Sequence, residues 1–208
     1  MNAHLRVGGF TPFTAIDYPG ELAAVVFCQG CPWRCRYCHN GHLLPARAPS
    51  THGWEQVVNF LADRRGLLDA VVFSGGEPTA QEALEGAVTE VRKLGFKVGL
   101  HTAGIYPRRL RRLIPRLDWV GLDIKALPEN YPAISGVARS GAAPWQSAKL
   151  LAEAGIPLQV RLTHHPRLTS HSELDQIRQK LRLLGIPHLE IQPCNSAQAL
   201  DETLRLSL

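Results

Sequence analysis

The sequence predicts an α/β protein with a parallel sheet, because short apolar runs rich in β-forming residues alternate with amphipathic helical patterns along the chain. Parallel neighbours need crossover connections, and these are almost always right-handed. Six such units suggest a partial, open (β/α)6 barrel. A doubly wound sheet fits the periodicity nearly as well, so the pattern alone does not decide closure.

The predicted strands are Leu22–Phe27, Ala70–Phe73, Lys97–His101, Trp119–Ile124, Leu158–Leu162 and Leu189–Gln192. The predicted helices are Trp54–Arg64, Ala80–Leu94, Pro107–Leu113, Pro144–Ala154 and Ser170–Leu184. Gly95, Gly155 and Gly185 each follow a helix, where a left-handed cap favours glycine. Before the first unit, Val7–Gly20 contains two prolines and three glycines, which predicts a short extra strand or hairpin.

Length and composition favour one domain over residues 1–208, since 208 residues that are 45% hydrophobic can bury one substantial core. No run approaches the roughly 18 to 20 apolar residues of a membrane span, and the N-terminus lacks a basic segment followed by an apolar stretch. We therefore expect a cytoplasmic protein without a membrane partner. Three of the five cysteines crowd into eight residues, which suits a metal centre better than disulfides.

The net charge of +5 raises nucleic acid as a possible partner. Arginines gather in two places, at Arg108, Arg109, Arg111, Arg112 and Arg116, and again from Arg178 to Arg182. The first group falls on an amphipathic pattern, Pro107–Arg116, whose apolar side would face the core. A solvated helix face is the favoured interpretation, so nucleic acid is not expected.

Three cysteines after the first predicted strand, Cys31, Cys35 and Cys38, are spaced so that one loop can wrap one metal centre. Four thiolates normally complete an iron–sulfur cluster, so three would leave one iron open to a small molecule. A structural zinc site with His39 as fourth ligand is the alternative. Its weakness is that His39 adjoins Cys38, and structural zinc sites usually draw ligand pairs from two separate places.

This Cys-x3-Cys-x2-Cys spacing, with Tyr37 before the last cysteine, resembles the signature of the radical S-adenosylmethionine superfamily. The segment Ser74-Gly75-Gly76-Glu77-Pro78 is similar to that superfamily's glycine-glycine-glutamate-proline motif, which binds the methionine amino group. Glycines at a strand end let the backbone approach a ligand, and a nearby carboxylate suits an ammonium.

Three further segments resemble the activating enzymes of glycyl-radical proteins, most closely the short activators of anaerobic ribonucleoside-triphosphate reductase. They are Asp17-Tyr18-Pro19-Gly20, His39-Asn40 after Cys38, and Asp123-Ile124-Lys125. The resemblance implies a partial α/β barrel of the radical S-adenosylmethionine type, with one [4Fe–4S] cluster and S-adenosylmethionine across the carboxyl ends of the strands. It also implies reductive cleavage of S-adenosylmethionine and abstraction of a hydrogen from a partner's glycine. A flavodoxin- or ferredoxin-type protein would donate the electron.

The same resemblance implies the site residues, with Cys31, Cys35 and Cys38 as cluster ligands and no catalytic base. The implied cofactor contacts are Tyr37, Cys38, His39, Gly75, Gly76, Glu77, Pro78, His101, Thr102, Asp123, Lys125, Arg161 and Gln192. Among these, Tyr37 would pack near the adenine, Lys125 would meet the cofactor carboxylate, and His101 and Thr102 would approach the ribose. Cys28 and Cys194 are expected to be buried as small hydrophobes, and His164 and His165 are unassigned.

Two alternatives remain open. A small-molecule radical enzyme such as 7-carboxy-7-deazaguanine synthase shares the cysteine and glycine motifs, whereas a zinc-binding module would leave the segments at 74–78 and 123–125 unexplained. The segment at 17–20 and the His39-Asn40 pair favour an activating enzyme. No eight-cysteine insertion follows the first unit, so a single cluster is expected.

Overall fold

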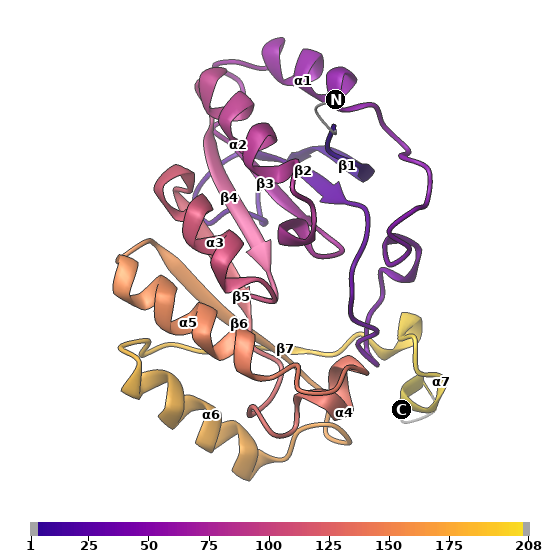
Figure 1. The fold of residues 1–208 in the computed structure, drawn as a ribbon, viewed down its shortest axis with the longest axis vertical. Helices are drawn as coiled ribbons and strands as arrows, with labels where there is room; N and C mark the ends of the chain where they lie inside the picture. The colour runs from indigo at the N-terminus through magenta and orange to yellow at the C-terminus, as the bar shows by residue number, and fades with distance from the viewer. Residues whose placement is uncertain (1–3, 206–208) are drawn as a thin grey trace.

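The computed structural model describes residues 4–205, which contain one seven-stranded sheet (Figure 1). Its strands are β1 (Val7–Thr14), β2 (Ala23–Cys28), β3 (Ala70–Gly75), β4 (Lys97–Thr102), β5 (Trp119–Asp123), β6 (Leu158–His164) and β7 (Glu190–Pro193). The extra strand β1 pairs antiparallel with β2, and β2 to β7 are parallel. The predicted N-terminal strand and the six parallel strands are therefore confirmed.

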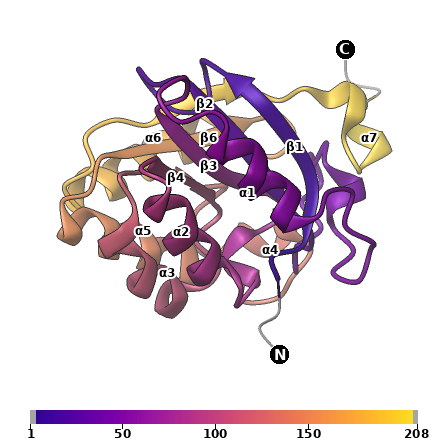
Figure 2. The same ribbon diagram turned by 90° about the horizontal axis from the view of Figure 1, so that it is seen from above.

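The strands lie side by side in the order in which the chain makes them, from β1 to β7. A doubly wound sheet would reverse its order at a switch point, so that alternative is wrong. Because right-handed crossovers that always advance in one direction place their helices on one face, the sheet curls away from a single helical layer. Figures 1 and 2 show α2, α3 and α5 together on that side. Among the described residues β1 and β7 are the two edges, so the barrel is open.

The helices are α1 (Trp54–Ala62), α2 (Leu84–Lys93), α3 (Pro107–Leu113), α4 (Tyr131–Ser135), α5 (Ala142–Ala154), α6 (His171–Leu183) and α7 (Glu202–Arg205). Short 3-10 turns occupy Gly41–Leu43, Pro78–Ala80, Ile114–Arg116 and Ser196–Gln198. The predicted start of α2 at Ala80 is wrong. Gln81 has an extended backbone. Its side-chain amide accepts a hydrogen bond from the Arg6 amide and donates one to the Arg6 carbonyl, so the helix begins only at Leu84. The five-residue α4 and the four-residue α7 are too short for a periodic pattern and were not predicted.

Alternate residues of the parallel strands face two different cores. Ala24 and Val26 of β2 face the helices, whereas Val25 faces the inside of the open barrel. There it packs in a smaller cluster with Tyr18 and Trp119, whose ring centroids are 5.3 Å apart. The segment before β2 thus fills the inner face where β5 begins. The hollow that remains lies toward the opposite, carboxyl ends of the strands.

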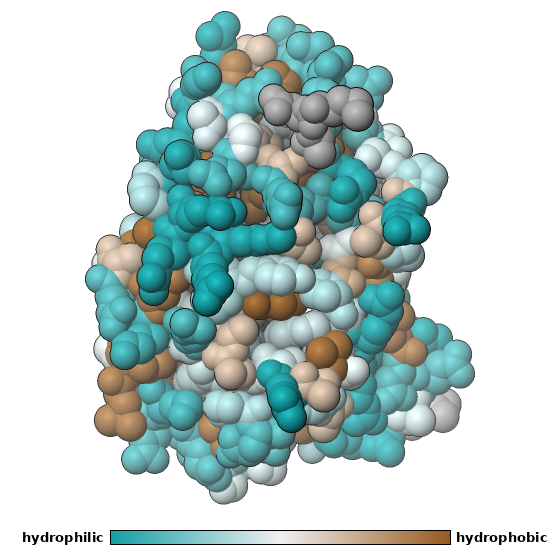
Figure 3. Space-filling model, in the orientation of Figure 1, coloured by the Kyte–Doolittle hydropathy of each residue, from teal (hydrophilic) through white to brown (hydrophobic). Residues whose placement is uncertain are grey.

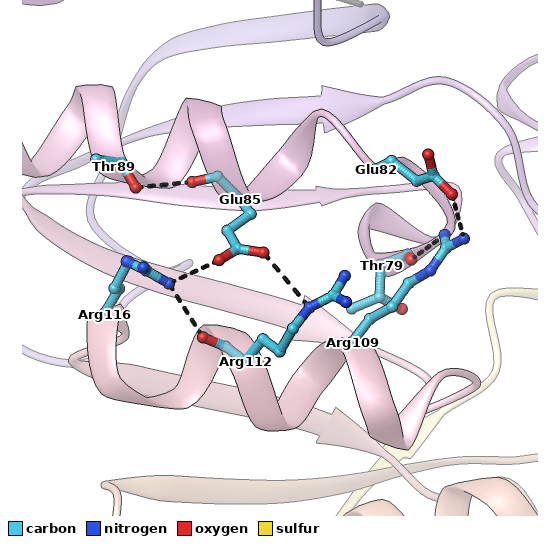
Figure 4. Close-up of polar contacts among 7 residues, drawn as sticks. All are labelled: Thr79, Glu82, Glu85, Thr89, Arg109, Arg112 and Arg116. Atoms are coloured by element: carbon cyan, nitrogen blue, oxygen red, sulfur yellow. Dashed lines mark hydrogen bonds and ion pairs between the residues drawn. The ribbon is translucent and has the colours of Figure 1, made fainter.

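Three arginines of α3 and of the 3-10 turn that follows it are engaged in ion pairs (Figure 4). Arg112 and Arg116 share Glu85, at 3.5 and 3.0 Å, and Arg109 contacts Glu82 at 3.2 Å. Figure 3 shows hydrophilic side chains over this part of the surface. The predicted amphipathic helix is confirmed, and the three arginines join α3 and the 3-10 turn after it to α2 and the residues just before α2. Within residues 4–205, no helix combines the length and the apolar character that a membrane span requires.

Candidate functional site

A cavity of about 390 Å³ opens at the carboxyl ends of the parallel strands. Ligands of parallel α/β folds bind at this end, so the position itself indicates a site. The predicted site residues that line it are Cys31, Cys35, Tyr37, Cys38, His39, Gly75, Gly76, His101, Thr102, Asp123, Lys125, Arg161 and Gln192. Glu77 and Pro78 do not line the cavity.

The three predicted cluster ligands lie on the loop that follows β2. Gly30 N–H donates to the Leu43 carbonyl at 2.7 Å, and the Cys38 amide donates to the Cys35 carbonyl at 2.9 Å, so the loop closes on itself. Burial raises the pKa of the Cys31 thiol to about 12 and also raises that of Cys35. Metal binding at these thiols would therefore displace protons.

The donor set fits an iron–sulfur cluster. Within residues 4–205, no three His, Cys, Asp or Glu side chains outline a site for a single metal ion. A four-iron cluster binds each thiolate through a different iron atom, which suits three cysteines spread along one loop. His39 also lines the cavity, beside Cys38.

The two glycines after β3 are required by the backbone beside them. Gly75 has φ +110°, and a Cβ there would lie 2.5 Å from the Cys28 nitrogen. A Cβ on Gly76 would lie 2.4 Å from the Gly30 carbonyl oxygen. The Gly76 amide donates to the Cys28 carbonyl and the Glu77 amide to the Gly30 carbonyl, both at 2.9 Å. This turn therefore fixes the start of the cysteine loop.

The Glu77 carboxylate, predicted from the sequence as a cofactor contact, is surrounded by protein donors. It is 1% exposed and accepts hydrogen bonds from the amide and hydroxyl of Thr79, from the Thr102 hydroxyl at 2.7 Å and from the Ala103 amide at 2.9 Å. Burial raises its pKa against the effect of these bonds. Glu77 thus ties the end of β3 to the end of β4, and the Thr102 hydroxyl is already engaged.

Side chains from β4, β5 and β6 form one chain of contacts inside the cavity. Arg161 lies 3.0 Å from the Asp123 carboxylate and donates to His101 Nδ1 at 3.1 Å. The other ring nitrogen, Nε2, lies 2.9 Å from the Asp17 carbonyl oxygen, so it carries the proton. Burial, and secondly Arg161, lowers the pKa of His101, which keeps the imidazole neutral.

Lys125 brings a buried positive charge to the same cavity. Its ammonium lies 5.4 Å from the centroid of the Tyr37 ring and forms no ion pair with a described carboxylate. Burial acts to lower the pKa of Lys125, but neighbouring acidic groups, Tyr37 first among them, raise it well above its usual value. Burial by itself would raise the pKa of Asp123, but the positive charges of Lys125 and Arg161 hold this pKa below its usual range. The buried Tyr37 hydroxyl has no hydrogen-bond partner among the described residues. The cavity can therefore accept an anionic group and a further polar contact.

Several lining residues were not predicted as site residues. Thr163 is the last residue but one of β6, and Asn195 follows β7, so the rule that ligands bind at carboxyl ends could have identified both. Asp17 comes from the segment before the first parallel strand, and the resemblance of residues 17–20 to activating enzymes was the one signal that could have identified it. Cys28 is fully buried in the apolar core as predicted, whereas Cys194 is only partly buried against it.

Comparisons with known proteins agree with this geometry. A sequence profile described as the radical SAM superfamily matches residues 25–181. A protein of Methanocaldococcus jannaschii assigned as a glycyl-radical enzyme activating enzyme is 34% identical over 133 residues, 60% of this chain and 52% of that protein. The pyruvate formate-lyase-activating enzyme of Clostridium pasteurianum is 28% identical over 174 residues, 81% of this chain and 72% of that enzyme.

A solved structure shares the fold. Streptococcus suis SuiB bound to S-adenosylmethionine superposes with a TM-score of 0.63 at 15% identity, covering 82% of this chain and 41% of SuiB. This chain spans only about half of the Methanocaldococcus protein's length and about seven tenths of the Clostridium enzyme's.

Proposed function

Since this chain belongs to the radical S-adenosylmethionine superfamily, we propose that it activates a glycyl-radical enzyme, and that its target is anaerobic ribonucleoside-triphosphate reductase. The observation that carries the proposal is the meeting of Cys31, Cys35, Cys38, the turn at 75–76 and Lys125 around one cavity. Membership of the superfamily implies a [4Fe–4S] cluster and S-adenosylmethionine as cofactors. When bound, they supply a carbon radical that takes a hydrogen atom from the target glycine.

The protein's own residues bind and orient. The three cysteines would hold the cluster, and Lys125 would bind the carboxylate of S-adenosylmethionine, since its ammonium is buried and pairs with no carboxylate of residues 4–205. The contacts of Arg161 fix Asp123 and His101, so these side chains cannot turn away from the cavity. Radical chemistry needs no general base, and the buried side chains of the lining, Trp33, Cys35 and Tyr37 among them, would help to keep water from the reaction.

An activating enzyme explains more of the site than the alternatives do. Asp17 lines the cavity, and it opens the segment at 17–20 that resembles activators. A zinc module would give no role to Lys125. Two of the sequence relatives are assigned as activating enzymes. The reaction needs an electron, for which we propose a flavodoxin- or ferredoxin-type donor. Cys31, Cys35 and Cys38 are free thiols, which suits a reducing cytoplasm.

Replacing Lys125 by methionine should weaken binding of S-adenosylmethionine without removing the cluster. A lost charge-assisted contact of this kind gives a dissociation constant roughly 10- to 100-fold higher. Calorimetric titration of the reconstituted variant measures it, with the visible absorbance of the cluster checked in the same sample. Lys149→Met, at an exposed position on α5, is the control that should bind normally. Equal affinity in both variants would remove Lys125 from the cofactor site.

Partner dependence tests the proposed function itself. Mixed anaerobically with reductant, S-adenosylmethionine and the cognate anaerobic reductase, the protein should generate a glycyl radical, seen as a doublet in electron paramagnetic resonance. Deuterated glycine in the reductase should place deuterium in the released 5′-deoxyadenosine. Transfer from pyruvate formate-lyase alone would correct the target and retain the reaction. Consumption of a pterin-like small molecule, with no transfer from any glycyl-radical protein, would establish the deazapurine-forming alternative.

A further inference from the structure

The loop that carries the three cysteines, residues 29–44, is held on two sides at Arg36, between Cys35 and Cys38. Helix α4 lies on one side of it. The amide of Arg36 donates to the Ile134 carbonyl at 3.0 Å, and the amide of Arg34 donates to the Ser135 carbonyl at 2.9 Å. These carbonyls belong to the last turn of a helix, where they have no partner within the helix itself. The cysteine loop supplies those partners.

The C-terminal segment, residues 195–205, lies on the other side of Arg36. The Arg36 carbonyl accepts a hydrogen bond from the Asp201 amide at 2.9 Å, and Arg36 Nε donates to the Asp201 carboxylate at 2.6 Å. Two bonds therefore join the same two residues, which are 165 positions apart in the sequence. Figures 1 and 2 both show α7 beside the N-terminal portion of the chain that contains this loop.

The C-terminal segment is itself anchored, so it can restrain the loop. Ala199 and Leu204 are fully buried in the main core. Arg167, which follows β6, donates to the Thr203 carbonyl at 2.8 Å. The second carboxylate oxygen of Asp201 accepts from the amide and hydroxyl of Thr203, at 2.9 and 2.7 Å. The carboxylate that reaches Arg36 is thus oriented before it makes that contact.

Two observations connect the segment to the site rather than to general packing. Asn195, at its start, lines the cavity. A Cβ on Gly41 would lie 3.0 Å from Leu200, so the segment also touches the far end of the cysteine loop. The segment lies beyond residue 181, where the match to the superfamily profile ends, so this contact is not part of the shared signature.

We propose that Asp201 is a positioning residue for the iron–sulfur cluster. Its contact with Arg36 holds the backbone between Cys35 and Cys38 in the conformation that presents both thiolates, and it slows opening of the loop and loss of iron. The proposal rests on the proposed function, because it assumes that these cysteines bind a cluster.

Iron release from the reconstituted protein tests the proposal. Asp201→Asn keeps the shape of the side chain and removes the charge that binds Arg36. Transfer of iron to a ferrous chelator should become roughly five- to tenfold faster, the factor expected when one partly exposed charge-assisted bond no longer opposes opening. Asp175→Asn, which breaks an exposed pair with Arg178, is the matched control and should release iron at the normal rate. Asp201→Glu should recover part of the loss.

Alkylation of the full iron-free chain separates loop opening from general destabilisation. In Asp201→Asn, iodoacetamide should modify Cys35 and Cys38 several-fold faster, while Cys28, fully buried in the core, should react at the wild-type rate. Equal acceleration at all three cysteines would show a merely structural role, and no acceleration would overturn the proposal. This measurement needs no iron. If the wild-type chain fails to bind a cluster, the proposed function fails, and alkylation still decides whether Asp201 holds the loop.

Discussion

Replacing Cys35 by alanine is expected to abolish cluster binding. Anaerobically reconstituted wild-type protein should hold about four irons and four sulfides per chain, with three thiolates as ligands. With only Cys31 and Cys38 left, a second iron would lose its protein ligand in a partly open cavity, and iron content should fall below roughly one per chain. Colorimetric iron and sulfide analysis, together with the visible absorbance, measures the result.

The two other cysteines supply matched controls. Cys28→Ala and Cys194→Ala should retain nearly full iron content, because neither residue lines the cavity. Cys28→Ala should cost some stability, since it leaves a small void in the core. Equal iron loss in all three variants would mean that the ligands are assigned wrongly. Stoichiometric zinc without sulfide in the wild-type protein would establish a zinc site instead.

Gly76→Ala should destabilise the iron-free protein, an effect that does not depend on any cofactor. The added Cβ would lie 2.4 Å from the Gly30 carbonyl oxygen and 2.7 Å from its carbon, so backbone and not a flexible side chain must move. We expect a loss of about 2 to 4 kcal/mol in unfolding free energy. For a chain of this size that lowers the melting temperature by roughly 4 to 16 °C in a calorimetric or circular-dichroism scan.

Gly86→Ala is the control for this substitution. Gly86 lies on the exposed side of α2, with no atom within 4 Å of an added Cβ. Alanine favours the helix there, so the melting temperature should rise by a few degrees, in line with the roughly 0.5 to 1 kcal/mol that glycine costs in a helix interior. Should Gly76→Ala melt like the wild type, the turn would not hold the cysteine loop. The motif's glycines would then serve only cofactor approach.

Much of the site could be predicted from sequence because its signals are local. The spacing of Cys31, Cys35 and Cys38 fits one loop independently of the rest of the fold. The glycines at 75–76 indicate that another backbone segment approaches closely. Strand periodicity located the carboxyl ends, and most of the residues predicted there line the cavity. The parallel strands were predicted for the same reason, since alternating apolar runs and helices depend on neighbouring residues alone.

Two features of the prediction depended on tertiary structure. The strand order, which excludes the doubly wound sheet, depends on which strands pair, and periodicity carries no information on pairing. Glu77 reads as a ligand-binding carboxylate in its motif. Only the packing of β3 against β4 brings the Thr102 hydroxyl and the Ala103 amide close enough to occupy it.

The sequence by itself determined the cysteine motif, the glycine turn and the strands that carry the site. The tertiary structure decided that Asp17 and Asn195 reach the cavity and that Asp201 meets Arg36. The physical reason is distance along the chain. A motif is specified by residues a few positions apart, whereas a contact across 165 positions exists only after the sheet has assembled and brought the segment after β7 beside the loop after β2.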